Sequence, residues 1–215
     1  MDSLQQLNER IFFFINGAMK HPVNDLWLGY TTFFGDAIFV YPAMIVLLYF
    51  IDRQNYRRNF LVFLLTAILG LIVTASLKSF FNAPRPLAYY ESAIKQGRVV
   101  VNVLFEPYTT RSFPSGHSQV CFTVAATLAW ILKHQSGTAT VAAVRQWIWA
   151  LYLCAVIGAI SRIYVGVHFP VDVVAGSLVG FSTAQLGLWI AERRIAARAE
   201  KTQLSQAPGT FEKHR

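Results

Sequence analysis

The stretch NFLVFLLTAILGLIVTASLKSFF, residues 59–81, decides the fold class, because it is an apolar run long enough to cross a bilayer. A crossing helix needs roughly 20 such residues. Comparable runs occupy residues 117–132, 147–166 and 171–191, and a shorter one at 36–51 is extended by upstream aromatic residues. We therefore expect an all-α fold, a polytopic transmembrane helix bundle of five to six spans.

The composition agrees with a membrane setting. The chain has 215 residues, of which 54% are hydrophobic and 14% charged, and soluble domains are less apolar than this. Its net charge of +8 is spread over short clusters between the apolar runs, not along one stripe interleaved with aromatics. That distribution follows the positive-inside rule, so we expect membrane lipid and no nucleic acid as a partner.

The two ends of the chain differ from the apolar middle. Residues 1–20 mix polar with apolar side chains, which predicts an amphipathic helix lying in the membrane interface, with a sixth crossing as the alternative. Residues 1–195 are expected to form a single domain, and the polar, basic tail 196–215 to be disordered. Gly176 and Gly180 form a GxxxG pair, which is typical of a close helix contact.

Basic residues also predict the orientation of the chain. The loops 52–58 and 133–146 and the C-terminal tail are rich in Lys and Arg, and they share one side if five spans alternate. That side, with the C-terminus, is expected to be cytoplasmic. The outer loop 82–116 and the segment 162–170 then lie on the opposite side, where further basic residues need another explanation.

The first of three polar motifs is KSFFNAPRP, which contains Lys78 and Arg85. Lys78 lies near the end of an apolar run, and Pro84 disfavours helix at Ala83. The chain should leave the helix there, so that Arg85 folds back towards Lys78. The alternative is a snorkelling lysine and an ordinary loop arginine.

The second motif is PSGH, residues 114–117. Ser115 and Gly116 open a helix, whose free backbone N–H groups and dipole suit an anion. His117 would face the same anion from the first turn. The alternative is a helix start capped by Ser115, with His117 as an interfacial side chain.

The third motif is SRIYVGVHFPVD, residues 161–172. His168 and Asp172 are four residues apart and share a face if a helix starts near Pro170. The carboxylate can then fix the imidazole tautomer. Gly166 is expected to end the preceding span, between Arg162 and His168. The alternative is an Asp–His pair that caps a helix, with Arg162 snorkelling.

All three motifs fall at span ends on the same predicted side. Together they offer cations, two histidines, a carboxylate and a helix N-terminus, a set that suits a tetrahedral oxyanion. The sequence has no acidic cluster for Mg²⁺, so we expect no metal and no other cofactor.

KX6RP, PSGH and SRX5HX3D, in this order over residues 78–172, resemble the signature of the type 2 phosphatidic acid phosphatase (PAP2) superfamily. The resemblance implies that His168 is a nucleophile that forms a phosphohistidine, oriented by Asp172, and that His117 is the general acid and base. It also implies phosphate-binding roles for the following residues: Lys78, Arg85, Arg162, Ser115 and Gly116.

The resemblance implies an activity and a place in the cell. We expect metal-independent hydrolysis of a lipid phosphate or prenyl diphosphate, with undecaprenyl diphosphate favoured, in a bacterial inner membrane with the site facing the periplasm. Phosphatidylglycerophosphate, phosphatidate and lipid A phosphates are alternative substrates. A vanadium haloperoxidase, or a transporter or scaffold with a degenerate site, is the alternative from another class. The sequence gives no indication of the oligomeric state.

The loop between the first two motifs offers possible contacts for a lipid headgroup. Lys95, Arg98 and Arg111 flank an apolar run, Val99–Phe105. We expect this run to dip into the membrane interface, so that a flanking cation can meet the second phosphate of a diphosphate. The alternative is a solvated loop whose charges contribute little.

Overall fold

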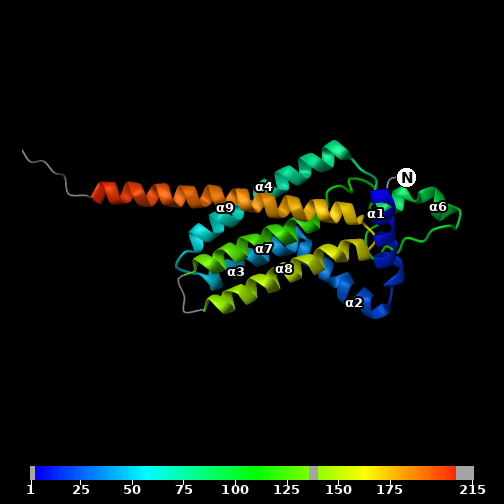
Figure 1. Cartoon of the computed structure of the whole chain (residues 1–215), viewed down its shortest axis with the longest axis horizontal. Helices are drawn as coiled ribbons and strands as arrows, with labels where there is room; N and C mark the ends of the chain where they lie inside the picture. The colour runs from blue at the N-terminus through cyan, green and yellow to red at the C-terminus, as the bar shows by residue number, and fades with distance from the viewer. Residues whose placement is uncertain (1–2, 136–139, 207–215) are drawn as a thin grey trace, which may run out of the picture.

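The structure is a computed structural model that describes residues 3–135 and 140–206 (Figure 1). Every regular element in these ranges is helical, which confirms the predicted all-α class. The elements are, in order, α1 (Ser3–Phe13), η1 (Phe14–Ala18), α2 (Pro22–Thr31), η2 (Thr32–Gly35), α3 (Ala37–Ile51), α4 (Tyr56–Phe81), α5 (Pro86–Tyr89), α6 (Glu91–Lys95), α7 (Gly116–His134), α8 (Val141–Tyr164) and α9 (Pro170–Gln206).

Helix α7 is the centre of the bundle and contacts α3, α4, α8 and α9. Its buried surface combines small side chains with polar ones that bond to the neighbouring helices. The Thr123 hydroxyl donates to the Gly180 carbonyl at 3.2 Å, and the hydroxyls of Thr66 and Thr127 lie 3.0 Å apart. Small residues and interhelical hydroxyl bonds hold helices together where lipid removes the hydrophobic drive for association.

The GxxxG pair makes the predicted close contact, and its partner is α7. A methyl group at Gly176 would collide with the carbonyl oxygen of Ser115, and one at Gly180 with that of Gln119. Helix α9 therefore lies directly against the backbone of the PSGH turn. Because Gly176 and Gly180 have no side chains, α9 with motif 3 at its start can approach α7 with motif 2 at its start.

Among the described residues, three segments are long and apolar enough to cross a membrane: Tyr56–Lys95, Val141–Tyr164 and Pro170–Gln203. The pair Pro22–Gly35 and Ala37–Ile51, which is bent by 68°, adds a fourth if it is one span. Large apolar side chains are exposed on these helices, for example Phe50, Ile72 and Trp149. The chain is thus an integral membrane protein, and a total of five to six spans, with α7 included, stays a prediction.

The N-terminal segment lies across one end of the bundle, where α8 ends and α9 begins (Figure 1). Phe12 is fully buried there, between Tyr90 and Phe169. Asn8 accepts a hydrogen bond from the backbone N–H of Val171 at 3.0 Å and so caps α9. The segment has the transverse orientation that an interfacial helix requires, and its position in the interface stays a prediction.

Helix α9 continues past the expected domain end at residue 195 and runs to Gln206 (Figure 1). Good helix formers such as Ala196, Ala197 and Arg198 continue the helix because nothing in the sequence stops it before that point. The part of the predicted tail that follows, 207–215, lies outside the described residues.

Candidate active site

Motif 1 folds back as the sequence predicts. Helix α4 ends at Phe81, and Asn82 follows in the left-handed conformation with φ 39°. The Lys78 ammonium, one turn before this end, donates to the Arg111 carbonyl oxygen at 2.7 Å. The lysine is therefore held towards the loop that leads into motif 2 and does not extend along the membrane surface.

Arg85 is fixed from three directions. Its Nε donates to the Thr110 carbonyl oxygen at 2.9 Å, and Nη1 donates to the Val167 carbonyl oxygen at 3.3 Å. Its guanidinium lies over the Tyr108 ring, 4.8 Å from the centroid, which is cation–π distance. One side chain of motif 1 thus ties the loop before motif 2 to the turn that carries His168.

Motif 2 opens α7 as predicted, and Ser115 caps the helix, which is the arrangement that the alternative interpretation of this motif expected. The Ser115 hydroxyl accepts from the backbone N–H of Ser118 at 3.4 Å, and the helix begins at Gly116. The backbone N–H of Ser115 donates to the Asp172 carbonyl oxygen at 2.9 Å, which joins motif 2 to motif 3. A methyl at Gly35 would lie 2.8 Å from the Cβ of His117, so the η2 turn packs directly on that histidine.

Arg162 lies at the end of α8, as predicted, and is buried. Its Nη1 donates to the Thr32 hydroxyl of the η2 turn. Its Nε is buried and has no hydrogen-bond partner among the described residues. A buried donor without a partner is costly unless a ligand supplies an acceptor. Helix α8 then ends at Tyr164, and Gly166 turns the chain with φ 80°.

His168 and Asp172 form the predicted pair, and Ser112 joins it. Helix α9 begins at Pro170, and His168 Nδ1 lies 3.4 Å from Asp172 Oδ2. The Ser112 hydroxyl donates to the same carboxylate oxygen at 2.5 Å and lies 3.3 Å from His168 Nδ1. The backbone N–H of Phe169 is a further donor to this oxygen at 2.9 Å. The carboxylate therefore fixes both the imidazole and the turn that carries it.

The pKa of His168 lies well below its usual range. Burial is the main cause, since only 1% of the residue is exposed, and the positive charges of Arg85, Arg162 and Lys78 add to it. The imidazole is therefore neutral at neutral pH. With Nδ1 facing Ser112 and Asp172, Nε2 is the nitrogen that remains for a substrate.

Two cavities surround His117. The larger, of about 510 Å³, is lined by Lys78, Arg85, Arg111, Gly116 and His117, among others. The smaller, of about 350 Å³, is lined by Arg162 and shares Asp36, Tyr108 and His117 with the first. The structure thus brings cations of motifs 1 and 3 to the two sides of His117, the histidine of motif 2 at the N-terminus of α7.

The outer loop delivers only one of its three candidate cations to this place. Arg111 lines the larger cavity and donates to the Ser79 hydroxyl at 3.1 Å. Lys95 is paired with Glu91 in α6 and exposed, and Arg98 is exposed as well. The run Val99–Phe105 packs in part onto the protein: Val99, Val101 and Leu104 contact buried apolar clusters, whereas Val100 and Phe105 are exposed.

Three residues of the site were missed by the sequence analysis. Ser112 contacts the His–Asp pair, Thr32 contacts Arg162, and Tyr108 covers Arg85. None of them belongs to a motif, and Thr32 is 130 residues away from its partner. Ser112 alone left a signal, a small hydroxyl residue close before PSGH, but only the fold shows where that hydroxyl points.

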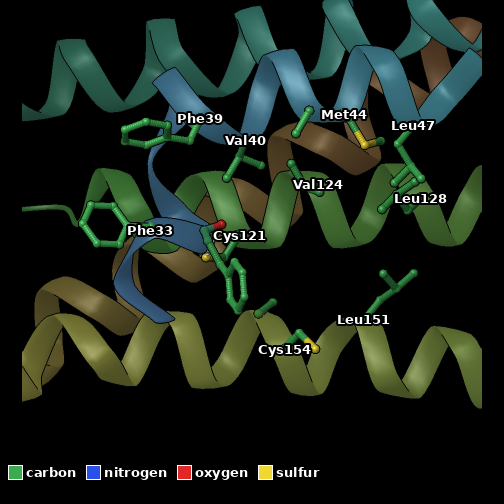
Figure 2. A pocket seen from close by; sticks show the side chains of 13 residues that line it. Phe33, Phe39, Val40, Met44, Leu47, Cys121, Val124, Leu128, Leu151 and Cys154 are labelled. Atoms are coloured by element: carbon green, nitrogen blue, oxygen red, sulfur yellow. Dashed lines mark hydrogen bonds between the residues drawn. The ribbon is translucent and has the colours of Figure 1, made fainter. Parts of the chain in front are cut away.

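An apolar groove runs beside the site, between α3, α7 and α8 (Figure 2). Its volume is about 410 Å³, and none of its described lining residues is charged. Phe33 of η2 lines both this groove and the smaller of the two polar cavities. A phosphoryl group cannot bind to such a surface, whereas a hydrocarbon chain can.

The segment that carries the three motifs matches a known protein family. The family model of the PAP2 superfamily covers residues 59–196, more than half of the chain. The chain belongs to the PAP2 superfamily. It is therefore an enzyme, a membrane hydrolase of the phosphatase type, which confirms the resemblance seen in the motifs.

Curated relatives and a solved structure extend this PAP2 match over most of the chain. Undecaprenyl-diphosphatase BcrC of Bacillus subtilis is 27% identical over 80% of this chain and 78% of its own. The bacitracin transport permease protein BcrC of Bacillus licheniformis is 27% identical over 89% of this chain and 84% of its own. LpxE of Aquifex aeolicus is 33% identical, with a TM-score of 0.66 over 85% of this chain and 94% of the LpxE chain.

Proposed function

We propose that this protein hydrolyses a lipid phosphate or prenyl diphosphate, with undecaprenyl diphosphate favoured, through a phosphohistidine on His168. One observation carries the proposal. A neutral, buried histidine has Nδ1 fixed by Ser112 and Asp172, and the cations around it include an arginine donor without a partner. A neutral imidazole in a cationic site is a nucleophile placed beside the anion that it attacks.

The first half of the reaction transfers the phosphoryl group to the protein. His168 Nε2 forms a bond to phosphorus while the bond from phosphorus to the leaving oxygen breaks. His117, which the bound phosphoryl anion stabilises in its protonated form, gives a proton to that oxygen, so the lipid leaves as an alcohol or as a monophosphate. Lys78, Arg85 and Arg162 compensate the charge of the phosphoryl oxygens.

The second half of the reaction restores the enzyme. His117, now unprotonated, takes a proton from water, whose oxygen attacks phosphorus and breaks the bond to His168. Inorganic phosphate leaves, and the imidazole is neutral again. The backbone N–H groups at Gly116 and the start of α7 add favourable dipoles to the phosphoryl oxygens in both halves.

The donor chemistry of the site supports a reaction without a metal. Positive side chains stand where divalent ions stand in other phosphoryl-transfer enzymes. The described residues contain no group of three or more His, Cys, Asp or Glu placed to hold a metal ion. We therefore propose that Lys78, Arg85 and Arg162 replace the metal as electrostatic catalysts.

The membrane setting supports a lipid substrate. The larger cavity has apolar side chains, among them Leu71 and Ala75 of α4, beside its polar ones. A lipid phosphate can place its headgroup among the cations while its chains stay in the hydrocarbon layer. The undecaprenyl diphosphate preference rests on the names of relatives such as BcrC of Bacillus subtilis. Phosphatidylglycerophosphate, phosphatidate and lipid A phosphates remain the alternative substrates.

The positions of the site and of the basic loops at opposite ends of the bundle support a periplasmic site in a bacterial inner membrane. The site, the outer loop and α1 lie at one end of the bundle, and the basic loop 52–58 lies at the other (Figure 1). By the positive-inside rule, the basic end and the C-terminus are cytoplasmic.

A side-by-side substrate panel tests the proposal. Detergent-solubilised protein is assayed for phosphate release from undecaprenyl diphosphate, phosphatidylglycerophosphate, phosphatidate and lipid A in the presence of EDTA. We expect undecaprenyl diphosphate to have the highest kcat/KM, and His117→Ala to lower it by roughly 10²–10⁴. A faster alternative substrate would replace the favoured one, and a strict Mg²⁺ requirement would contradict the mechanism.

The panel also separates the other classes of function. A haloperoxidase would oxidise bromide in the presence of vanadate, and a transporter or scaffold with a degenerate site would release no phosphate from any lipid. We expect vanadate to inhibit phosphate release as a phosphate mimic, without bromide oxidation.

The three loop cations test the preference for a diphosphate. Of these three cations, Arg111 is the one that lines the larger cavity. Arg111→Gln is therefore expected to raise KM for a prenyl diphosphate more than for the monophosphate with the same chain. Lys95→Gln and Arg98→Gln are the matched controls and should leave both KM values unchanged. Equal effects of Arg111→Gln on both substrates would remove the loop's contribution to the preference.

A further inference from the structure

Asn16 lies far from the three motifs in the sequence but is bonded to the turn that carries His168. It belongs to η1, a π-helical turn, and only 1% of the residue is exposed. Its Nδ2 donates to the carbonyl oxygens of Asn102 at 2.7 Å and of Tyr164 at 2.8 Å. Tyr164 is the last residue of α8, four positions before His168.

Asn102 of the outer loop completes a reciprocal pair with Asn16. Its backbone N–H donates to Asn16 Oδ1 at 2.9 Å, and its own side-chain amide donates to the Asn16 carbonyl oxygen at 2.9 Å. Both amide protons and the oxygen of the Asn16 side chain are therefore used. A fully satisfied buried network of this kind fixes one arrangement of the backbone, because any other leaves polar groups unpaired.

The pair leaves room for nothing larger than glycine in the turn. A methyl group at Gly166 would collide with the Asn102 carbonyl oxygen and lie 3.1 Å from Asn16 Nδ2. Gly166 also has φ 80°, a conformation that side chains disfavour. Two residues later comes His168, and between them the Val167 carbonyl oxygen accepts from Arg85 at 3.3 Å.

Apolar clusters exclude water from both sides of this network. Phe12, Ile163 and Phe169 belong to one cluster, and Tyr164 and Val167 to the next. The partly buried Ile15, beside Asn16 in the chain, packs against both clusters. The hydrogen bonds of Asn16 are thus made in an environment where losing them is costly.

We propose that Asn16 is a positioning residue for the reaction: through Asn102 and Tyr164 it holds the α8–α9 turn so that His168 meets the phosphoryl group in line. It touches neither substrate nor the reacting atoms. The inference rests on the proposed role of His168, and it gives the N-terminal segment a task in catalysis besides its predicted place in the membrane interface. π-helical turns are rare in proteins, and those that occur lie frequently at functional sites.

The inference predicts a defect in turnover that leaves binding intact. A displacement of about 1 Å between reacting groups costs on the order of 10²-fold in rate. Asn16→Ala removes three hydrogen bonds, so we expect kcat to fall by roughly 10- to 100-fold with KM changed by less than about 2-fold. Lys78, Arg85 and Arg162, which bind the phosphoryl oxygens, keep their own contacts.

Two further variants grade the effect. Asn16→Asp keeps an oxygen for the Asn102 N–H but turns another oxygen towards two carbonyls, so its kcat should be no higher than that of Asn16→Ala. Asn102→Ala removes only the side-chain bond to the Asn16 carbonyl oxygen and should lower kcat by a few-fold. It is also the variant to measure if Asn16→Ala does not fold.

Asn59 provides the matched control, because it is another fully buried asparagine with side-chain hydrogen bonds. It bonds to Asp52 and Arg58 at the opposite end of the bundle. Asn59→Ala should lower the Tm without lowering kcat, when kcat is measured well below the Tm of every variant.

The experiment measures Tm, kcat and KM for the wild type and four variants in the same detergent with the same lipid phosphate. The variants are Asn16→Ala, Asn16→Asp, Asn102→Ala and the control Asn59→Ala. A normal kcat in Asn16→Ala or in Asn102→Ala would overturn the inference, as would an equal loss of kcat in Asn59→Ala. His168→Ala is measured in parallel. If it keeps its turnover, the proposed nucleophile fails, and the positioning role fails with it. A normal kcat in Asn16→Ala beside an inactive His168→Ala would refute the positioning role alone.

Discussion

At the residue scale, the Ser112 hydroxyl contacts both members of the His168–Asp172 pair. It donates to Asp172 Oδ2 at 2.5 Å and lies 3.3 Å from His168 Nδ1, inside the buried site. Without it, the carboxylate loses a donor, and the imidazole loses a neighbour that restricts its ring. The hydroxyl therefore helps to fix the tautomer in which Nε2 is free.

We predict that Ser112→Ala lowers kcat by about 10-fold, the equivalent of one net hydrogen bond of roughly 1.4 kcal/mol. Phosphate binding should persist, because the cations are unchanged, so KM should move little. Ser177→Ala is the control, since among the described residues that hydroxyl donates only to the Val173 carbonyl oxygen, within α9 itself. Steady-state kinetics with one lipid phosphate decide: a kcat for Ser112→Ala equal to that of Ser177→Ala would contradict this role.

The sequence predicted the motif residues but not their neighbours, and the reason is physical. Lys78, Arg85 and His117 are chemically conspicuous at the ends of apolar runs, where charge is costly. Asn16 and Thr32 are ordinary polar residues in the sequence. Their partners lie up to 148 and 130 residues away, so only the packing of the bundle reveals them.

At the element scale, the helix starts were predictable because they depend on local chemistry. Ser115 before Gly116, and Pro170 as the first residue of α9, are start signals that act within one turn. The end expected at residue 195 was too early, because the first Pro and Gly after it are Pro208 and Gly209, just beyond Gln206. The π-helical η1 was not predictable, because no local pattern specifies a π-turn.

The contact between α7 and α9 provides a test at this scale. Alanine at position 176 would meet the backbone of Ser115, which cannot move without shifting the PSGH turn. We predict that Gly176→Ala lowers both the Tm and kcat, although alanine is intrinsically better in a helix by roughly 1 kcal/mol.

Gly17→Ala is the matched control for this prediction, because an added methyl group there would have nothing within 4 Å. It should leave kcat and the Tm near the wild-type values. Thermal unfolding and phosphate release on the same preparations provide the comparison. A Gly176→Ala protein with the properties of the Gly17→Ala protein would show that the two helices are not in close contact.

At the scale of the whole molecule, the bundle places chemistry at one end and most of its basic loops at the other. The site lies where α4 and α8 end and α7 and α9 begin, next to α1 (Figure 1). In the proposed orientation, four cations lie on the side that the positive-inside rule leaves poor in them because they line the candidate site: Lys78, Arg85, Arg111 and Arg162. Lys95 and Arg98 lie on the same side but do not reach the site.

Thiol labelling in intact cells tests the orientation. In a background with Cys121→Ala and Cys154→Ala, a cysteine is placed at Ser92 in the outer loop or at Gln54 in the opposite loop, both exposed positions. We predict that an impermeant thiol reagent labels Ser92→Cys from outside, and Gln54→Cys only after permeabilisation. The reverse pattern would place the site in the cytoplasm.

The central claim is that His168 carries the phosphoryl group during turnover. The direct measurement is to mix enzyme with a lipid phosphate that is radiolabelled in the scissile phosphoryl group, to quench within one turnover, and to count the label on the protein. We predict a label that is stable in alkali and labile in acid, as expected for phosphohistidine, and its absence in His168→Ala, whose turnover should fall by about 10³-fold or more. An equal label on His168→Ala, or one with the opposite stability, would contradict the account.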